Sequence, residues 1–141
     1  MTAIHPYLKN DRYAQYLNIE LLEAANGTAK ATMLIEPHHL NSHGTVHGGA
    51  IFSLADAVLA AASNSHGVVA VAINANISYL KAATSGTLTA IAEEVSLNAS
   101  LGVYDIRVTA DSGELIASFQ GMVYRKKGRT IESAHSERVG D

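Results

Sequence analysis

The chain of 141 residues contains no cysteine. This absence excludes disulfides, thiolate metal sites and a cysteine nucleophile. Charge is scarce as well, since charged residues make up 16% of the chain whereas 48% is hydrophobic. Such a composition is apolar for a small soluble domain, and we expect a partner subunit to cover part of the apolar surface.

Two classes of function are disfavoured by what is missing. The chain has 10 Lys and Arg against 13 Asp and Glu, a formal net charge of −3, and no block of like charges, which disfavours nucleic-acid binding. The most apolar segment, residues 50–62, is interrupted by Asp56 and is shorter than the ~20 residues of a bilayer span. We therefore expect no membrane insertion. Because the first residues contain no apolar stretch of signal-peptide length, a cytoplasmic location is the default expectation.

We predict a single domain over residues 1–141, with an N-terminal segment up to about residue 15 and a flexible polar tail from about residue 127. No repeat or linker interrupts it, and its only prolines are Pro6 and Pro37. The pattern predicts a short helix over residues 8–17 and a first strand from residue 18 to a hairpin turn at Asn26-Gly27. Further strands are predicted over residues 28–35, 68–80, 86–97, 102–110 and 114–124.

Residues 48–63 are predicted to form the one long helix, because this stretch is rich in strong helix formers. It is apolar on nearly every side, and such a helix is normally buried. Two strands, a buried helix and four further strands joined by short turns predict an α+β fold, in which an antiparallel sheet wraps around one long central helix.

Gly48 and Gly49 begin this helix. The unpaired backbone N–H groups and the positive end of the helix dipole form a site for negative charge, such as an oxyanion. Glycine also lets a ligand approach the backbone closely. The alternative is that the two glycines only permit tight packing of the helix on the sheet, and the residues alone leave both interpretations open.

Asp56 is the only charged residue between Gly48 and Ser65. Its neighbours on the helix are small or apolar, and buried carboxylates are rare unless they are paired or used in chemistry. We therefore predict that Asp56 is catalytic, against the alternative of an exposed stripe on the helix. Asn41 and His47 lie in the loop before the helix and can orient a substrate carbonyl or a water, although either can equally cap the loop.

Four segments carry a resemblance to a known family. They are residues 41–56, which contain His-Gly-Gly followed by Phe-x-Leu-Ala-Asp, and residues 63–67, 76–81 and 102–105. Over roughly residues 16–130 the chain resembles the phenylacetate-degradation (PaaI-like) thioesterases of the hotdog superfamily. The resemblance implies a hotdog fold and the hydrolysis of an acyl-CoA thioester, with phenylacetyl- or hydroxyphenylacetyl-CoA as candidate substrates.

The resemblance also implies roles for single residues. The carboxylate that matches Asp56 acts as base or nucleophile, and the backbone amide that matches Gly48 polarises the thioester carbonyl. Asn41 and His47 match the supporting polar positions. The catalytic candidates are therefore these four residues.

The candidates for substrate binding lie mostly outside the loop. The family often has a Ser or Thr on the strand after the helix, where this chain reads Ala-Ile-Asn-Ala over residues 72–75. CoA phosphates are anionic, so a chain of net charge −3 needs local positive charge to hold them. Basic residues cluster over residues 125–129, just after the last predicted strand, and Lys81 ends the first strand after the helix; the alternative is a solvated basic tail. The substrate-binding candidates are Gly49, Asn74, Lys81, Arg125 and Lys126.

The spacing of two candidates predicts an oligomer. Asp56 lies eight residues beyond Gly48, which separates them by ~12 Å along the helix at 1.5 Å per residue. A carbonyl held at the Gly48 amide needs a carboxylate within roughly 3 to 4 Å of its carbon. The aspartate must then come from an antiparallel helix of a second chain. The spacing thus predicts a homodimer with shared active sites, which the resemblance also implies. A dimer of dimers, a homotetramer, is the assembly that we expect, and the residues leave dimer and tetramer open.

Some of the same residues occur in sites of other functions. His39, His43 and His47 are spaced by four, as helical metal ligands are, but Pro37 argues against a helix there, and no metal or other cofactor is expected. No Gly-x-Ser-x-Gly elbow or phosphate loop occurs. Enoyl-CoA hydration or dehydration, with His47 and Asp56 as paired acid and base, remains open, as does a non-catalytic acyl-CoA-binding module. For hydrolysis, activation of water by Asp56 and direct attack through an anhydride both remain open.

Overall fold

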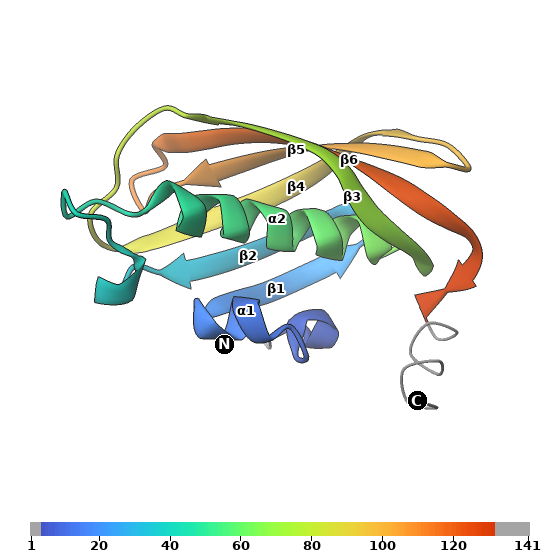
Figure 1. Cartoon of the computed structure of the whole chain (residues 1–141), viewed down its shortest axis with the longest axis horizontal. Coiled ribbons are helices and arrows are strands. Elements are labelled where there is room, and N and C mark those ends of the chain that lie inside the picture. The colour runs from blue at the N-terminus through green and yellow to red at the C-terminus, as the bar shows by residue number, and fades with distance from the viewer. Residues whose placement is uncertain (1–3, 132–141) are drawn as a thin grey trace.

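The computed structural model describes residues 4–131. One antiparallel sheet of six strands, in the order β1-β2-β4-β5-β6-β3, curves around the long helix α2 (Figure 1). This arrangement confirms the predicted α+β architecture and matches a hotdog fold. The elements are a 3₁₀ helix (Pro6–Leu8), α1 (Arg12–Tyr16), β1 (Ile19–Ala25), β2 (Thr28–Leu34), a second 3₁₀ helix (Pro37–His39), α2 (Gly48–Asn64), β3 (Val68–Tyr79), β4 (Thr87–Leu97), β5 (Leu101–Thr109) and β6 (Leu115–Thr130).

Small side chains on the concave face of the sheet let α2 pack closely against it. Ala31 of β2 and Ala90 of β4 are fully buried beneath the helix. In β6, a Cβ on Gly121 would lie 2.6 Å from Leu59 Cδ2 of α2, so only glycine fits there without a shift of the Leu59 side chain. The position of α2, and of every group that it carries, is set by these contacts.

The sheet covers most of α2 but leaves one face open. Gly49 and Asp56 are exposed, and Phe52, Ser53 and Ala60 are half-buried. The expectation that the helix is buried on nearly every side is therefore wrong for this face. The buried residues of α2 are Ala50, Ile51, Leu54, Ala55, Ala57, Val58, Leu59, Ala61, Ala62, Ser63 and Asn64.

The two edge strands differ. At the β1 edge, the N-terminal segment crosses the strand, and the His5 N–H donates to the Leu21 carbonyl at 2.7 Å. At the β3 edge, Ile73 and Tyr79 are 54% and 52% exposed and most of the twelve residues are exposed. A long, unprotected and partly apolar edge strand is a template for pairing with another chain.

Three predicted boundaries need correction. The helix predicted over residues 8–17 is limited to Arg12–Tyr16 and follows a 3₁₀ helix. The loop predicted from Pro37 begins with another short 3₁₀ helix. The polar tail predicted from about residue 127 is wrong up to Thr130, because β6 continues along β3, pairing Arg125 with Ala70 and Thr130 with Val68. The rest of the predicted tail lies outside the described residues.

No helix in the described part of the chain is both long and apolar enough to cross a membrane.

Candidate active site

The loop before α2 is anchored by a buried histidine. The Nδ1 of His39 accepts the Glu36 N–H at 3.0 Å, and its Nε2 lies 2.7 Å from the Leu17 carbonyl. The His39 carbonyl in turn accepts the His47 N–H at 2.7 Å. Because His39 is 1% exposed and both ring nitrogens have partners, it holds the start of α2 in place.

His47 is the N-cap of α2. Its backbone is extended, with φ −59° and ψ 135°, and its Nδ1 accepts the Gly49 N–H at 2.8 Å. Its carbonyl accepts the Ala50 N–H at 2.9 Å. These contacts satisfy two of the amides that the first turn of a helix leaves unpaired, so the capping role of His47 is present and its exposed ring stands at the entrance to the helix.

Gly48 has the one amide of this turn that remains available. No acceptor for its N–H is found within residues 4–131, while its carbonyl accepts the Tyr79 hydroxyl at 2.9 Å. The amide lies at the positive end of the helix dipole, where negative charge is stabilised. A Cβ on Gly48 would lie 3.1 Å from the Tyr79 ring. Both interpretations of this glycine therefore apply: it permits close packing and it presents a donor.

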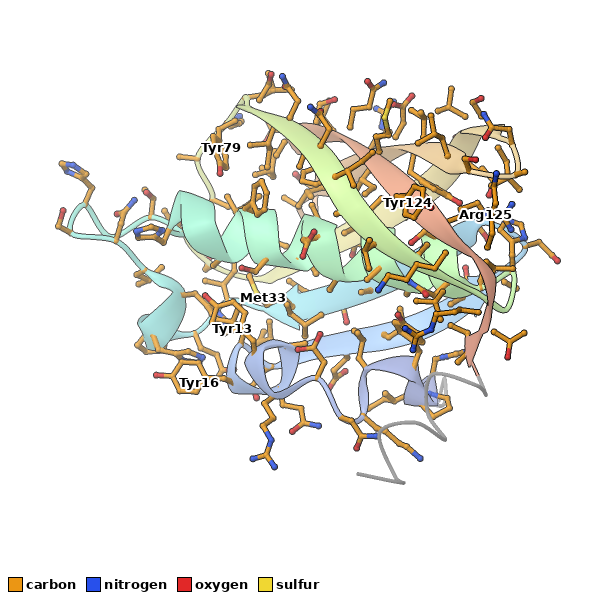
Figure 2. The ribbon with its side chains drawn as sticks, turned by 45° about the vertical axis from the view of Figure 1, so that its right-hand side comes forward. Tyr13, Tyr16, Met33, Tyr79, Tyr124 and Arg125 are labelled. Atoms are coloured by element: carbon orange, nitrogen blue, oxygen red, sulfur yellow. The ribbon has the colours of Figure 1, made fainter. Side chains whose placement is uncertain are left out.

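A cavity opens beside this amide. It has a volume of about 390 Å³, and Gly48, Tyr79 and Lys81 contribute to its wall. Tyr79 lies at the end of β3 next to the start of α2 (Figure 2). The remaining lining residues are Thr45, Val46, Ile51, Leu80 and Ala82. An available N–H, a cation and several apolar side chains are thus gathered at one place, as a small-molecule site requires.

Asn41 closes the loop upstream of this cavity. Its Oδ1 accepts the N–H groups of His43 at 2.9 Å and Thr45 at 3.2 Å, and its Nδ2 donates to Thr45 Oγ1 at 2.9 Å. The side-chain amide of Asn41 therefore makes its hydrogen bonds within the loop, as expected for a residue that caps the loop. The effect is to present Thr45 and the following helix entrance in a fixed geometry.

Asp56 lies on the open face of α2 and is exposed. The prediction of a buried carboxylate is therefore wrong for the single chain, because the sheet covers the opposite face of the helix. Burial still raises the pKa of Asp56, and the negative charge of Asp11 raises it further. Asp11 and Ala60, which lies one turn further along α2, line a pocket of about 560 Å³. A raised carboxyl pKa suits a general base.

Asp56 and the Gly48 cavity are separate within one chain. Eight residues along α2 divide them, about 12 Å at the helical rise, and Asp56 is not among the residues that line the cavity. His47 is one residue further from Asp56, so one chain does not pair the histidine with the carboxylate as a hydratase would require.

The candidates for substrate binding are spread over the sheet. Lys81 lines the Gly48 cavity and forms an ion pair with Glu114. Asn74 is paired with Met122, one position from Gly121, whose face packs on the helix. Because neighbouring strand residues alternate between faces, Asn74 is on the face turned away from α2 and does not reach the cavity.

Arg125 pairs with Ala70, at the far end of the β3–β6 ladder from Tyr79 (Figure 2), and Lys126 and Lys81 follow Arg125 and Tyr79 in the sequence. Arg125 is half-buried, and its Nη1 donates to the Asn98 carbonyl at 2.9 Å. Within one chain these basic residues therefore do not surround a pocket together with Lys81.

The three histidines at four-residue spacing do not converge. His39 is buried with both nitrogens engaged, His43 is exposed in the loop, and His47 caps α2. Among residues 4–131 no group of three potential ligands is placed to hold a metal ion.

Two features were missed by the sequence analysis. Tyr79 contacts Gly48 across 31 positions of sequence; its two-residue spacing from Ile77 in the predicted strand 68–80 was the available signal that the two side chains share a face. A cavity of about 880 Å³ lies beside β1, lined by residues such as Leu8, Ile19 and Glu20. It is larger than the Gly48 cavity but contains none of the candidate catalytic residues, so we assign the chemistry to the entrance of α2.

Comparison with known proteins shows the family of the chain. The model of the Thioesterase superfamily matches residues 43–117, more than half of the chain. The acyl-coenzyme A thioesterase PaaI of Escherichia coli is 38% identical over 125 residues, covering 88% of this chain and 89% of that protein. An Archaeoglobus fulgidus protein is 45% identical over 118 residues, covering 83% of this chain and 77% of that one.

Solved structures give the same result. The E. coli PaaI protein from the phenylacetic acid degradation operon has a TM-score of 0.85, covering 89% of this chain and 91% of that one. A hypothetical thioesterase from Streptococcus pneumoniae, solved with coenzyme A, has a TM-score of 0.80 at 25% identity, covering 87% of this chain and 99% of that one. The chain therefore belongs to the thioesterase superfamily and is a thioester hydrolase, a hotdog-fold acyl-CoA thioesterase of the PaaI-like family.

Proposed function

We propose that this enzyme hydrolyses arylacetyl-CoA thioesters such as phenylacetyl- or hydroxyphenylacetyl-CoA, at sites shared between two subunits. The observation that carries the proposal is the Gly48 amide, which lacks an acceptor within residues 4–131 and borders a cavity, eight residues from the carboxylate of Asp56. The Gly48 amide of one subunit would hold the thioester oxygen, and Asp56 of the second subunit would supply the base.

In the first chemical step, water attacks the carbonyl carbon and Asp56 takes the proton of the water. The charge that develops on the oxygen is stabilised by the Gly48 N–H. The intermediate then collapses, the carbon–sulfur bond breaks, and the proton on Asp56 passes to the departing sulfur to give free acid and CoA thiol. In the alternative route Asp56 attacks the carbonyl carbon directly, the carbon–sulfur bond breaks and CoA leaves as the thiolate, and water then hydrolyses the mixed anhydride to free acid and the Asp56 carboxylate.

The open edge of β3 supports the dimer that this chemistry needs. A second β3 added antiparallel would satisfy the unpaired backbone groups of both strands through a twofold, self-complementary contact. It would also run the two α2 helices in opposite directions, so that the start of one approaches the middle of the other. The apolar side chains of Val71 and Ile73, 40% and 54% exposed, would be covered.

Substrate class and location are further parts of the proposal. Val46, Ile51 and Tyr79 give the cavity an apolar wall suited to an acyl or aryl group. The E. coli relative comes from a phenylacetic acid degradation operon, which supports an arylacetyl substrate and a cytoplasmic role in phenylacetate degradation. Further pairing of dimers into a tetramer also remains our proposal.

Basic residues would hold the nucleotide end of CoA. An antiparallel dimer would bring Lys81 of one subunit toward Arg125 and Lys126 of the other, because these groups lie at opposite ends of the β3–β6 ladder. Replacing Lys126 and Lys127 with glutamine should raise the KM for acyl-CoA and flatten its salt dependence. An unchanged KM at low salt would assign these charges to solubility.

A panel of acyl-CoA substrates with detection of released thiol tests the function. We expect thiol release, with the highest kcat/KM for arylacetyl-CoA. Loss of enoyl absorbance without thiol release would instead indicate a hydratase, and binding without turnover would indicate a binding module. Single turnover in heavy-oxygen water, followed by mass analysis of Asp56, tests for the anhydride route, because only attack of water on the aspartyl carbon of an anhydride can place the label in the protein.

A further inference from the structure

Tyr79 and His47 are joined through one peptide group. The Tyr79 hydroxyl donates to the Gly48 carbonyl at 2.9 Å, and the Gly49 N–H donates to His47 Nδ1 at 2.8 Å. The Gly48 carbonyl and the Gly49 N–H belong to the same peptide bond. A carbonyl that accepts a hydrogen bond makes the N–H of its own peptide a better donor, so the two contacts strengthen each other.

This chain of hydrogen bonds decides where the proton of a neutral His47 lies. Because Nδ1 accepts the Gly49 N–H, it carries no proton, and the ring proton must be on Nε2. No partner for Nε2 is found within residues 4–131, and the ring is exposed at the helix entrance. The imidazole therefore presents an N–H donor at the exposed entrance to α2.

The contact between Tyr79 and Gly48 is built into the sequence. The place where a Gly48 Cβ would stand is 3.1 Å from Tyr79 Cζ and 3.2 Å from its hydroxyl oxygen. Only glycine lets the ring lie this close without a shift of the neighbour. Tyr79 is itself 52% exposed, so burial alone gives little reason for its position, and the hydroxyl contact explains its orientation over the cavity.

We propose that Tyr79 is a positioning residue of the thioesterase: its hydroxyl fixes the Gly48–Gly49 peptide and, through that peptide, the orientation and tautomer of His47. The inference rests on the proposed function for its effect on turnover. The link from Tyr79 to His47 depends only on the two hydrogen bonds and not on the proposed function.

The variant Tyr79→Phe tests the link, because it removes one oxygen and keeps the ring against Gly48. We expect nitrogen NMR of the full-length protein, at a pH where the imidazole is neutral, to show His47 with its proton on Nε2. In Tyr79→Phe the fraction in this tautomer should fall, and the Gly49 amide should exchange with solvent about 10-fold faster, in line with a loosened hydrogen bond. The control Tyr16→Phe removes a hydroxyl from a tyrosine that is 70% exposed on α1 and should change neither signal.

The same variants are then assayed on acyl-CoA. Tyr79→Phe should lower kcat about 3- to 10-fold with KM changed less than about twofold, because orientation rather than binding is lost. Unchanged tautomer and exchange in Tyr79→Phe, or altered NMR signals with an unchanged kcat, would overturn the assignment. If the wild-type enzyme releases no thiol from any acyl-CoA, the proposed function fails, while the NMR result still decides whether Tyr79 positions His47.

Discussion

The two ends of α2 are built in opposite ways. At its start, His47 is exposed, the Gly48 amide has no acceptor among the described residues, and a cavity borders the first turn. At its end, Ser63 and Asn64 are buried. Asn64 donates to the Ala60 and Ala70 carbonyls at 2.9 and 3.1 Å and accepts the Ala70 N–H at 3.0 Å.

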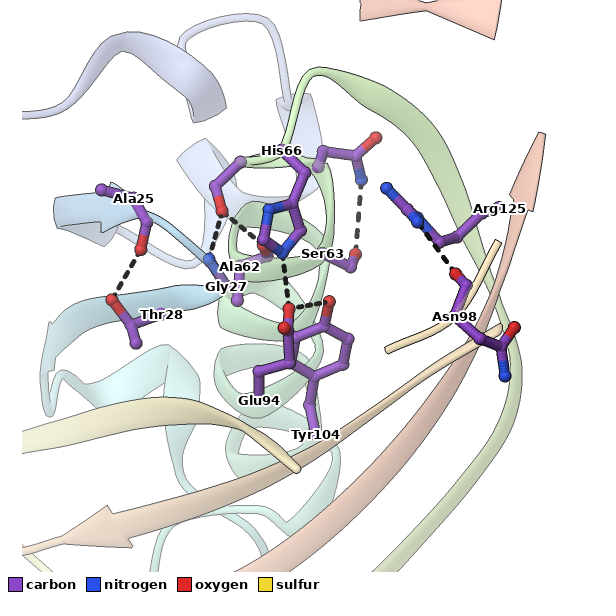
Figure 3. Close-up of polar contacts among 12 residues, drawn as sticks. Ala25, Gly27, Thr28, Ala62, Ser63, His66, Glu94, Asn98, Tyr104 and Arg125 are labelled. Carbon is purple, nitrogen blue, oxygen red and sulfur yellow. Dashed lines mark hydrogen bonds and ion pairs between the residues drawn. The ribbon is translucent and has the colours of Figure 1, made fainter. Parts of the chain in front are cut away.

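The turn after the helix is held further by contacts with β4, β5 and the turn between β1 and β2 (Figure 3). His66 Nε2 lies 2.6 Å from Glu94 Oε2, and the Tyr104 hydroxyl donates to the same oxygen at 2.8 Å. Burial, followed by the contact with Glu94, raises the pKa of Tyr104. The Glu94 carboxyl lies where a Cβ of Gly27 would stand, and the Gly27 N–H donates to Ser65 Oγ at 2.8 Å.

The difference between the two ends of α2 indicates that one end anchors the helix and the other end is available to bind a ligand. Buried polar groups that are fully paired fix one arrangement of the chain, so the closed end holds α2 against the sheet. A donor left without a partner beside a cavity is available to a ligand. Changes at the start of α2, the open end, should therefore reduce turnover while the fold persists. Changes at the end of α2 around Asn64, the closed end, should reduce stability while turnover per folded molecule persists.

The largest expected effect is that of Asp56→Asn. We expect turnover of acyl-CoA to fall by at least about 10²-fold, the scale for a lost general base, with an unchanged circular dichroism spectrum. Near-native turnover would contradict the assignment.

The same variant has a stability signature. The pKa of Asp56 in the folded protein is raised above 3.8, its ordinary value in the unfolded chain. Between the unfolded-state pKa and the folded-state pKa, the folded protein therefore binds more protons than the unfolded chain. The free energy of unfolding falls as pH rises through that window. Asp56→Asn should therefore unfold at a slightly higher temperature than wild type at pH 7, and the difference should shrink as the pH falls toward 3.8.

The next effect is the loss of the Gly48 donor. Gly48→Pro removes the N–H at the first helical position, where proline is favoured, and the extended His47, with ψ 135°, is compatible with a following proline. We expect kcat to fall about 10²-fold or more, as for other oxyanion donors. Gly48→Ala adds the same Cβ against Tyr79 but keeps the N–H, so it should lose less than about 10-fold. If kcat falls equally in Gly48→Pro and Gly48→Ala, the added side-chain atoms, and not the missing N–H, are the cause of the loss.

At the closed end, Tyr104→Phe should act on stability. The hydroxyl is fully buried and donates to Glu94 at 2.8 Å. Its loss removes a hydrogen bond to a charged group, which costs about 1.5–3 kcal/mol. Denaturant unfolding should show this decrease, and kcat of the folded enzyme should stay within about twofold of wild type. A large loss of kcat in Tyr104→Phe without a loss of stability would contradict the assignment of stability to this end of α2 and of turnover to its start.

The smallest effect is expected from Asp11→Asn. Asp11 accepts the Ala14 N–H at 2.9 Å as the N-cap of α1, and asparagine caps equally well. The substitution removes the charge that raises the pKa of Asp56. Since the base must be ionised to act, the acidic limb of the kcat/KM profile should move to lower pH, while the plateau stays unchanged. An unmoved limb would show that Asp11 does not act on the reacting carboxylate.

Local signals predicted much of the fold. The turn at Asn26-Gly27 has the two positive φ values, 53° and 81°, that its residues favour. The long helix begins at the predicted Gly48 and ends one residue beyond the predicted boundary, because its composition and its glycine entrance are both local properties. The spacing of Gly48 and Asp56 along that helix also follows from the sequence alone.

What was missed depends on contacts between distant segments. Which face of α2 the sheet leaves open, and so the exposure of Asp56, depends on how the sheet packs. The extension of β6 to Thr130 depends on pairing with β3, which outweighs the polar character of that stretch. The contact of Tyr79 with Gly48 joins residues 31 positions apart.

The most direct test of the account is the activity of hybrids between Asp56→Asn and Gly48→Pro subunits. Each parent should be inactive, but a hybrid dimer would combine an intact Gly48 amide with an intact Asp56 in one of its two sites. Random mixing of equal amounts should then restore about one quarter of wild-type turnover. If hybrids form, as shown by mass spectrometry of differently tagged subunits, and turnover stays at the level of the parents, the shared active site is wrong.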